Sequence, residues 1–245
     1  MIHQTAIVSS NAKIGNNVSI GAFTIIHDNV EIGDGSEIES YCEIGYPTPL
    51  ADNNPLIIGN NSRIRSHSLF YQGSVFGENL ITGHRVTVRE KTIAGVNLQI
   101  GTLSDFQGDC KIGDYVRTHS SVHIGKHSII GSFVWLYPYV VLTNDPHPPS
   151  NFEAGVTVRD YAVIATMSVV LPGITVGEHS LIAAHSLVKE DVLPHKVVGG
   201  SPAKQLCSTS SIKLKDGSNG NAYPWPRHFH RGYPKHILEE WALEF

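Results

Sequence analysis

The chain has 245 residues, of which 41% are hydrophobic and 16% charged, and its formal net charge is −4. It has no apolar run long enough to span a membrane, and a mildly acidic chain without basic stripes excludes the usual nucleic-acid-binding class. The first residues enter a repeat directly without a signal peptide, so we expect a cytoplasmic protein.

Apolar residues recur at every sixth position over residues 2–44, 58–141 and 158–188. A representative hexad is Ile112-Gly113-Asp114-Tyr115-Val116-Arg117, with an aliphatic opening residue, then Gly, and a small or branched fifth residue. A short fixed repeat buries its apolar face only against neighbouring copies, so stacked units share one core. The period predicts a parallel β-helix, in which each hexad forms a short strand and a corner. At corners such as Ile14-Gly15-Asn16 and Ile32-Gly33-Asp34, we expect Gly, Asn and Asp because they tolerate positive φ.

The repeat is interrupted twice by turn-forming residues. The first interruption covers residues 50–57, and the second runs from about Thr143 to Thr157 and contains Asn144-Asp145-Pro146-His147-Pro148-Pro149. Insertions in a solenoid emerge as loops that reach a neighbour or line a site. The second loop supplies polar side chains just before the last coils, so we interpret it as a candidate part of a functional site.

The three cysteines do not indicate a disulfide framework. Cys42 and Cys110 occupy the small fifth position of their hexads, which predicts buried thiols in the core. Cys207 lies beyond the last repeat.

The last repeats carry a more specific pattern: Leu171-Pro172-Gly173-Ile174-Thr175-Val176-Gly177, then residues 181–192, then Gly200-Ser201-Pro202-Ala203-Lys204. Together with the hexads, this pattern resembles the hexapeptide-repeat acyltransferases. The resemblance implies a left-handed parallel β-helix with three hexads per coil, hence about nine coils over residues 1–206. It also implies a homotrimer, with outward residues such as Trp135, Tyr137 and Tyr139 available for subunit contacts.

In members of that family which use acetyl-coenzyme A, these coils bind the coenzyme through backbone groups and a terminal cation. The resemblance therefore implies an acyl-coenzyme A co-substrate. The residues that it assigns to coenzyme binding are Ala165, Thr166, Ala183, Ala184, Lys189, Ser201 and Lys204. The match is imperfect at Ala184, where the family has Gly, and at Lys189, which is shifted by one position.

Acyl transfer needs a group that accepts a proton from the attacking amine or hydroxyl. His84 stands third in its hexad, where sugar-nucleotide acyltransferases of this fold often place their base, but Arg85 replaces the usual Asp. His147 is the rival, because His147-Pro148 resembles the His-Pro of other acetyltransferases of this fold. The loop lies closer along the prism to Lys204 than His84 does, so the loop is our first choice for the reacting thioester and His84 the second.

Asn144 and Asp145 have a role of their own in this interpretation. Leu142-Thr143-Asn144-Asp145 resembles the Thr-Asn-Asp of N-acyltransferases that act on amino sugars linked to UDP or dTDP. In that role Asp145 would attract an ammonium group, and Asn144 would donate to the thioester oxygen or hold the sugar. His123 faces outward on a nearby coil and could line the same groove as a substrate contact.

The resemblance implies an N-acyltransferase that acts on a nucleotide-linked amino sugar, in lipopolysaccharide or other surface glycan biosynthesis. O-acylation of a sugar or small alcohol is the alternative. A carbonic anhydrase and a structural β-helix are two further classes of this fold; we expect no metal site, because no two histidines have the five-residue spacing of the anhydrase ligands.

Residues 207–245 form a separate segment in this interpretation. Ser, Asn and Gly over 208–220 indicate a linker. Ile237, Leu238, Trp241, Ala242 and Phe245 have helical spacing, which predicts a short amphipathic helix from about Pro234. We expect this tail to pack on the solenoid or on a neighbour, or to shape the acceptor pocket.

Overall fold

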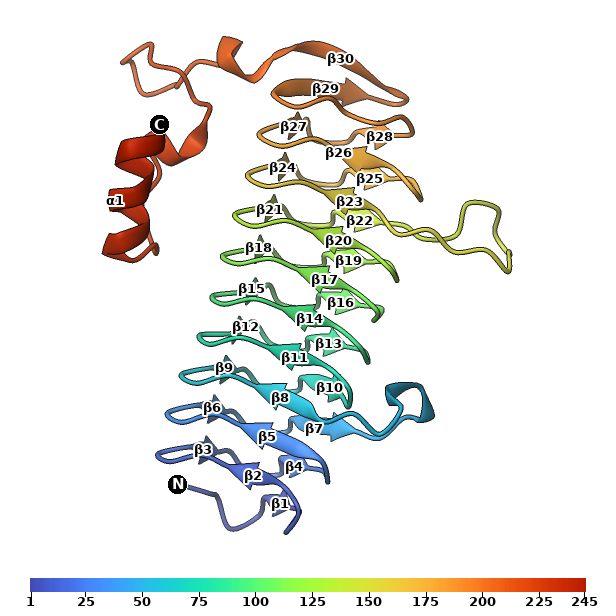
Figure 1. The fold of residues 1–245 in the computed structure, drawn as a ribbon, viewed down its shortest axis with the longest axis vertical. Helices are drawn as coiled ribbons and strands as arrows, with labels where there is room; N and C mark the ends of the chain where they lie inside the picture. The colour runs from blue at the N-terminus through green and yellow to red at the C-terminus, as the bar shows by residue number, and fades with distance from the viewer.

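The computed structural model describes residues 1–245 as a three-sided parallel β-helix followed by a tail that folds back along it (Figure 1). Each side of the prism is one sheet, and we number the sheets 1, 2 and 3 in the order in which the chain visits them. Sheet 1 holds β1 (Ile7–Val8), β4 (Ile25–Ile26), β7 (Glu43–Tyr46), β10 (Leu69–Tyr71), β13 (Thr87–Val88), β16 (Asp105–Phe106), β19 (His123–Ile124), β22 (Val141–Leu142), β25 (Val169–Val170) and β28 (Leu187–Val188).

Sheet 2 holds β2 (Lys13–Ile14), β5 (Val30–Ile32), β8 (Leu56–Ile58), β11 (Val75–Phe76), β14 (Ile93–Ala94), β17 (Lys111–Ile112), β20 (Ile129–Ile130), β23 (Thr157–Val158) and β26 (Thr175–Val176). Sheet 3 holds β3 (Ser19–Ile20), β6 (Glu37–Ile38), β9 (Arg63–Ile64), β12 (Ile81–Thr82), β15 (Gln99–Ile100), β18 (Arg117–Thr118), β21 (Trp135–Leu136), β24 (Val163–Ile164), β27 (Leu181–Ile182), β29 (Lys196–Gly200) and β30 (Ala203–Ser208).

The predicted left-handed parallel β-helix is confirmed. Within a sheet every pair of strands is parallel except β29 and β30, which form an antiparallel hairpin over the last coil. The sheets contain 10, 9 and 11 strands, so the prism is slightly longer than the nine coils that we predicted. No helix of the structure has the length and apolar character needed to cross a membrane.

The corner glycines are explained by close packing between coils, and our prediction of positive φ at Gly15 and Gly33 was wrong. The left-handed conformation falls two positions later, at Asn17 (φ 57°) and Gly35 (φ 69°). At Gly33 a Cβ atom would lie 2.5 Å from the backbone nitrogen of Asn60 in the next coil. Any side chain there would push two coils apart, because such a distance is far inside van der Waals contact.

The interior of the prism is a single hydrophobic cluster of 40 buried residues. The small fifth position of the hexad is often a buried Ser or Thr whose hydroxyl bonds to the backbone. Ser62, for example, donates to the carbonyl of Gly59 at 2.7 Å and accepts from the amide of Leu80 at 3.3 Å. Cys42 and Cys110 fill the same position and are buried free thiols.

Both predicted interruptions are loops. The chain between β7 and β8 forms a short 3-10 turn at Pro49–Ala51, and Lys91 pairs with Asp52 at 2.6 Å. The chain between β22 and β23 leaves the prism as a long arm (Figure 1). Both loops lie at the corner between sheets 1 and 2, which we call the 1–2 corner.

The tail packs on the corner between sheets 2 and 3. The helix α1 (Lys235–Glu244) begins directly after Pro234, as predicted, and buries Ile237 and Trp241. Two further 3-10 turns cover Thr209–Ser211 and Trp225–Arg227. At this corner one residue of each coil has the left-handed backbone conformation. It is Asn at residues 61, 79 and 97, and it is aromatic at residues 115, 133 and 161, where the tail covers the corner. Stacked rings at this height, such as Phe133 on Tyr161 at 4.8 Å, form the surface that the tail covers.

Candidate functional site

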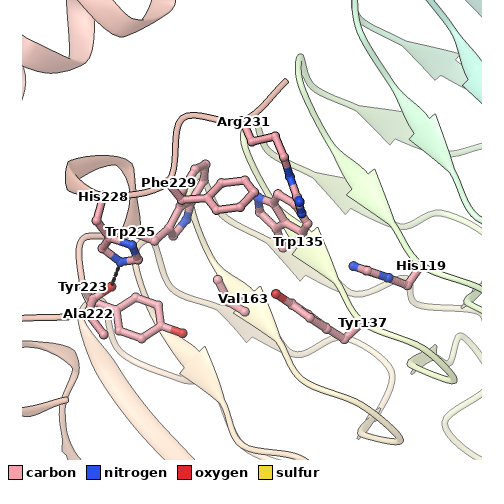
Figure 2. Close-up of a pocket in the computed structure, with 10 residues that line it drawn as sticks. All are labelled: His119, Trp135, Tyr137, Val163, Ala222, Tyr223, Trp225, His228, Phe229 and Arg231. Carbon is pink, nitrogen blue, oxygen red and sulfur yellow. Dashed lines mark hydrogen bonds between the residues drawn. The ribbon is translucent and has the colours of Figure 1, made fainter. Parts of the chain in front are cut away.

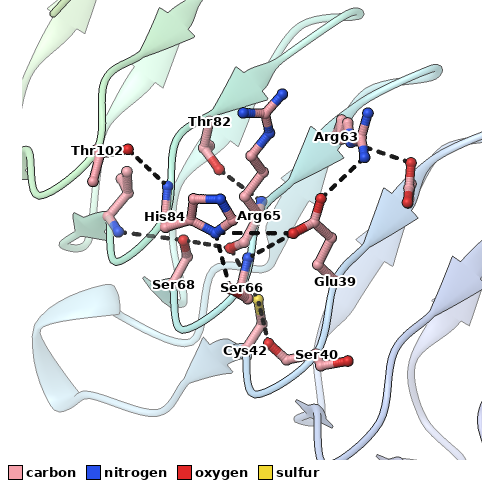
Figure 3. Close-up of polar contacts among 12 residues, drawn as sticks. Glu39, Ser40, Cys42, Arg63, Arg65, Ser66, Ser68, Thr82, His84 and Thr102 are labelled. Carbon is pink, nitrogen blue, oxygen red and sulfur yellow. Dashed lines mark hydrogen bonds and ion pairs between the residues drawn. The ribbon is translucent and has the colours of Figure 1, made fainter. Parts of the chain in front are cut away.

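His84 lies at the corner between sheets 3 and 1, which we call the 3–1 corner, directly after β12. Its Nδ1 is 2.9 Å from the hydroxyl of Ser66 in the preceding coil and 4.0 Å from a carboxylate oxygen of Glu39 (Figure 3). Its backbone amide donates to the hydroxyl of Thr102 in the following coil at 3.2 Å. The imidazole is therefore held at one edge by neighbouring coils, while its Nε2 has no partner within the chain.

Glu39 is fixed by contacts that do not involve the histidine. One oxygen accepts from Arg63 Nη2 at 3.1 Å, and the other accepts from the amide of Ser66 at 3.2 Å. Its side chain is 22% exposed, against 49% for His84. A fixed carboxylate on the Nδ1 side orients the ring and can stabilise the positive charge that forms when the ring accepts a proton during a reaction.

A buried thiol lies beneath this cluster. Cys42 Sγ contacts the carbonyl oxygen of Arg65 at 3.2 Å, and burial raises the pKa of the Cys42 thiol to about 11. A thiol that stays protonated at neutral pH is a poor nucleophile. The cluster therefore provides a candidate proton acceptor but no activated sulfur.

A polar groove runs along sheet 3 from this cluster toward the tail. Gly83, which precedes His84, and Thr102, which binds its amide, line the groove at one end. Arg117 and Arg231 line it at the other end, where the groove meets the tail. His84 thus stands at the rim of a surface channel large enough for a small molecule.

The structure does not bring the loop residues to His84. Asn144, Asp145 and His147 follow β22 at the 1–2 corner, so sheet 1 separates them from the 3–1 corner. The Asp145 carboxylate accepts from the amides of His147, at 3.0 Å, and Ser150, at 3.2 Å. The side-chain nitrogen of Asn144 donates to Glu153 at 3.3 Å. Asp145 and Asn144 thus stabilise the arm itself, and the His147 side chain is exposed without a partner.

His123 faces outward from sheet 1, between the two corners. Its Nδ1 is 3.2 Å from a carboxylate oxygen of Asp105, its register partner in β16. Burial alone would raise the pKa of Asp105, but hydrogen bonds from His123 and Gln107 outweigh it and lower the pKa below the ordinary value. Our sequence reasoning missed Asp105, although the one-coil spacing of 18 residues could have revealed it.

The residues predicted to bind coenzyme A do not form one site. Ala165, Thr166, Ala183 and Ala184 lie at the 3–1 corner, and Ser201 follows β29 on that side. Lys189 and Lys204 instead line a pocket at the end of the prism, together with Glu190 and Asp191. Two carboxylates beside two ammonium groups cancel the positive field that nucleotide phosphates would need.

No three His, Cys, Asp or Glu side chains of the structure are arranged to hold a metal ion.

The family model described as bacterial transferase hexapeptide (six repeats) matches residues 11–46. A protein from Saccharophagus degradans is 36% identical over 131 residues, which are 54% of this chain and 48% of that protein. A protein from Campylobacter concisus is 27% identical over 210 residues, 82% of this chain and 71% of the relative. Both are named acyl-(acyl-carrier-protein)–UDP-N-acetylglucosamine O-acyltransferase. The chain thus spans about half the length of the first relative.

A solved structure agrees with the fold. The UDP-N-acetylglucosamine acyltransferase from Bacteroides fragilis superposes with a TM-score of 0.51 at 19% identity, covering 98% of this chain and 81% of that one. At this identity the likeness shows the fold alone. The predicted resemblance to the hexapeptide-repeat transferases is confirmed by the family match and by the names of the relatives.

The prediction of an acyl-coenzyme A co-substrate was wrong. Both relatives are named for an acyl-carrier-protein donor, and neither name contains coenzyme A. The charge balance around Lys189 and Lys204 agrees with this correction. The terminal pattern indicated the repeat family correctly, but it did not identify the donor.

Proposed function

We propose that this protein is an acyltransferase that moves an acyl group from the thioester of an acyl carrier protein to a hydroxyl group of a UDP-linked sugar. The observation that carries the proposal is the His84–Ser66–Glu39 cluster, which stands at the rim of the groove on sheet 3. The names of the two relatives support the classes of donor and acceptor.

With its proton on Nδ1, which faces Ser66 and Glu39, the His84 ring has the free lone pair that the reaction needs on Nε2. In the proposed mechanism Nε2 takes the proton of the acceptor hydroxyl while the oxygen attacks the thioester carbonyl. The tetrahedral intermediate then breaks its carbon–sulfur bond, and the imidazolium returns the proton to the carrier thiolate. Glu39 stabilises the imidazolium between these steps, because its carboxylate is held on the Nδ1 side of the ring.

The cluster also bears on the choice between a hydroxyl and an amine as the acceptor. A neutral amine attacks a thioester without a base, whereas a sugar hydroxyl must lose its proton to a nearby group. A histidine with a carboxylate behind it supports O-acylation. This reverses our first preference for N-acylation of an amino sugar, which rested on Asn144 and Asp145.

The loop at the 1–2 corner is the second candidate for the proton acceptor. In that case His147, with Asn144 and Asp145, would meet a thioester held near the end of the prism. The exposed position of His147 on the extended arm supports a contact outside its own prism, such as one with a neighbouring subunit.

We also propose that the protein forms a homotrimer through the 3–1 corner. Large apolar side chains are exposed there in several coils: Phe23, Tyr41, Leu103, Tyr139 and Met167. His67, Arg85 and Ser121 take the same position in the coils between them. Trp135 and Tyr137, which we expected to make subunit contacts, are instead half-buried beneath the chain's own tail. Of the three aromatic residues predicted for the interface, only Tyr139 is more than half exposed.

The direct test is a transfer assay with a purified acyl carrier protein charged with acyl chains of several lengths. UDP-N-acetylglucosamine and its 3-amino analogue would serve as acceptors, and mass spectrometry would identify the product. We expect an ester on the hydroxyl acceptor. Exclusive formation of an amide would reverse the choice of acceptor atom, and no product from any carrier-bound donor would refute the proposed function.

A further inference from the structure

The groove on sheet 3 has an unusual charge for a chain whose net charge is −4. Arg65, Arg117 and Arg231 line it, and no Asp or Glu does. None of these three arginines forms an ion pair with a carboxylate; Arg117 donates to the backbone carbonyls of Arg231, at 3.3 Å, and Gly232, at 2.9 Å. Guanidinium groups without a carboxylate partner around a groove favour a ligand with several negative charges, because Arg matches phosphate oxygens with paired donors.

Beyond Arg231 the groove continues into a pocket between sheet 3 and the tail. Its walls are mainly aromatic, with Trp135 and Tyr137 contributed by the prism and Tyr223, Trp225 and Phe229 by the tail (Figure 2). His119, Trp135 and Arg231 line both the groove and the pocket, so the two form one continuous channel. No Asp or Glu lines the pocket either.

Polar groups with no partner point into this pocket. In Figure 2 the hydroxyl groups of Tyr137 and Tyr223 and the ring of His119 converge on the same space. Neither hydroxyl forms a hydrogen bond within the chain. The His119 ring stacks on Tyr137 at 4.7 Å and lies tilted against Trp135 at 5.9 Å. Flat aromatic walls with a few free hydrogen-bonding groups suit a planar heterocycle that carries its own donors and acceptors.

The register of sheet 3 sets the distances along the channel. Ile81, three residues before His84, aligns with Gln99, then Arg117, then Trp135 in successive strands. At the usual spacing between strands, Arg117 lies about 10 Å and the aromatic pocket about 14 Å along the axis from His84. The order along the channel is therefore proton acceptor, cations, aromatic pocket, which matches sugar, diphosphate and base in a sugar nucleotide.

We propose that the tail completes the acceptor site: the nucleobase lies in the aromatic pocket between Tyr137 and the tail, and the diphosphate lies against Arg117 and Arg231. This orientation directs the sugar toward His84, and it rests on the proposed function in taking a sugar nucleotide as the acceptor. The C-terminal segment thus has a binding role in addition to packing on the prism.

The test is calorimetric titration of the full chain with UDP and with uridine, which lacks the phosphates. We expect Arg231→Gln to weaken UDP binding about tenfold or more and to leave uridine binding unchanged, because a charge-assisted contact to phosphate is lost. We expect Tyr137→Leu to weaken the binding of both ligands roughly tenfold, because the stacking surface is lost.

Matched controls separate these effects from general damage. Arg159→Gln removes an exposed arginine that has no side-chain partner and lies outside the channel, and Tyr46→Leu removes an exposed tyrosine at the end of β7 in sheet 1. Both controls should bind UDP as the wild type does. Thermal melts of all four variants verify that the tail stays packed.

The outcomes distinguish this inference from the proposed function. If UDP binds to the wild type and neither Arg231→Gln nor Tyr137→Leu changes its affinity, the nucleotide lies elsewhere, and the inference fails while the acyltransferase proposal stands. If both variants behave as expected but no carrier-bound acyl group is transferred, the binding site stands and the proposed reaction fails. A wild type that binds no UDP would refute both.

Discussion

The Ser66 hydroxyl lies 2.9 Å from His84 Nδ1, although 18 residues separate the two in sequence. One coil of the prism has this length, so the two side chains occupy equivalent positions in adjacent coils. With Glu39 two coils below His84, the contact orients an imidazole whose other nitrogen is free. The reaction proposed above depends on this arrangement.

His84→Asn should lower kcat for acyl transfer by about 10²- to 10⁴-fold, because the attacking hydroxyl loses its proton acceptor. The KM for the sugar nucleotide should change little, since His84 lies at the rim of the groove and not among its cations. Steady-state kinetics with varied acceptor concentration separates the two constants.

Two other histidines serve as comparisons for His84. His67→Asn alters the residue next to Ser66 at the same corner, which stacks on Tyr41 at 5.0 Å and does not line the groove, and it should have near wild-type turnover. His147→Asn should also retain turnover if His84 is the base. A large loss in His147→Asn together with an active His84→Asn would transfer the role to the loop.

Glu39→Gln should reduce turnover about threefold to tenfold, as expected for a partly exposed charge acting across 4.0 Å. The carboxylate stabilises the imidazolium that forms during transfer, so its removal should lower kcat and leave the KM for the acceptor nearly unchanged. Steady-state kinetics measures both constants.

Glu37→Gln is the matched control for this effect. Glu37 pairs with the same Arg63, at 3.3 Å, but does not contact His84. Its kcat should match that of the wild type. Equal losses of kcat in both variants would mean that Arg63, not the charge of Glu39, governs the site.

Acid should loosen the tail through His179. Its ring stacks on Tyr161 at 4.7 Å and on His195 at 5.1 Å, and its Nδ1 is buried without a hydrogen-bond partner. Burial, and then the neighbouring His195, lower the pKa of His179 from the ordinary value of 6.5. The unfolded chain therefore binds a proton at higher pH than the folded chain does. The contribution of the buried neutral ring to the free energy of unfolding is complete above pH 6.5 and is lost as the pH falls below this value.

Thermal melts between pH 7.5 and pH 5 test this prediction. The melting temperature of the wild type should fall more steeply with acid than that of His179→Phe, which keeps a ring in the stack but cannot be protonated. Parallel curves for the two proteins would show that the burial of His179 has no role in acid sensitivity.

Gly59→Ala should destabilise the prism by about 1–3 kcal/mol or more, because overpacking forces the backbone to move. Its Cβ would lie 2.5 Å from the carbonyl carbon of Gly77 in the next coil. Chemical denaturation measures the free energy of unfolding.

Gly220→Ala provides the comparison within the same chain. A Cβ there would meet side-chain atoms no closer than 3.4 Å, so this variant should unfold close to the wild type. Equal stability of Gly59→Ala and the wild type would contradict the close-packing account of the corner glycines.

Much of the fold was predictable from the spacing of apolar residues alone. The six-residue period, the two insertions and the helix after Pro234 are local patterns, and each appears where the sequence indicated. The conformation of Gly15 and Gly33 was not predictable, because glycine is required at these positions by close packing against the adjacent coil.

The site was harder to predict because its members come from different coils. Neighbouring coils are normally offset by 18 residues, as for Asn16 and Asp34, but the first insertion widens the offset to 26 at Asp34 and Asn60. That insertion lies between Glu39 and His84 and hides their relationship. Asn144 and Asp145 add a second difficulty, since a polar motif that resembles a substrate site also forms hydrogen bonds within its own loop.

The sequence by itself determined a stacked β-helix, because each hexad must bury its apolar residues against the next copy wherever the chain goes. Only the tertiary structure decided which polar side chains meet, because that depends on the coil offset across an insertion and on the direction in which the tail folds back. The channel from His84 to the aromatic pocket exists for this reason: sheet 3 lines one side of it, and residues 222–231 of the tail line the other side of the pocket.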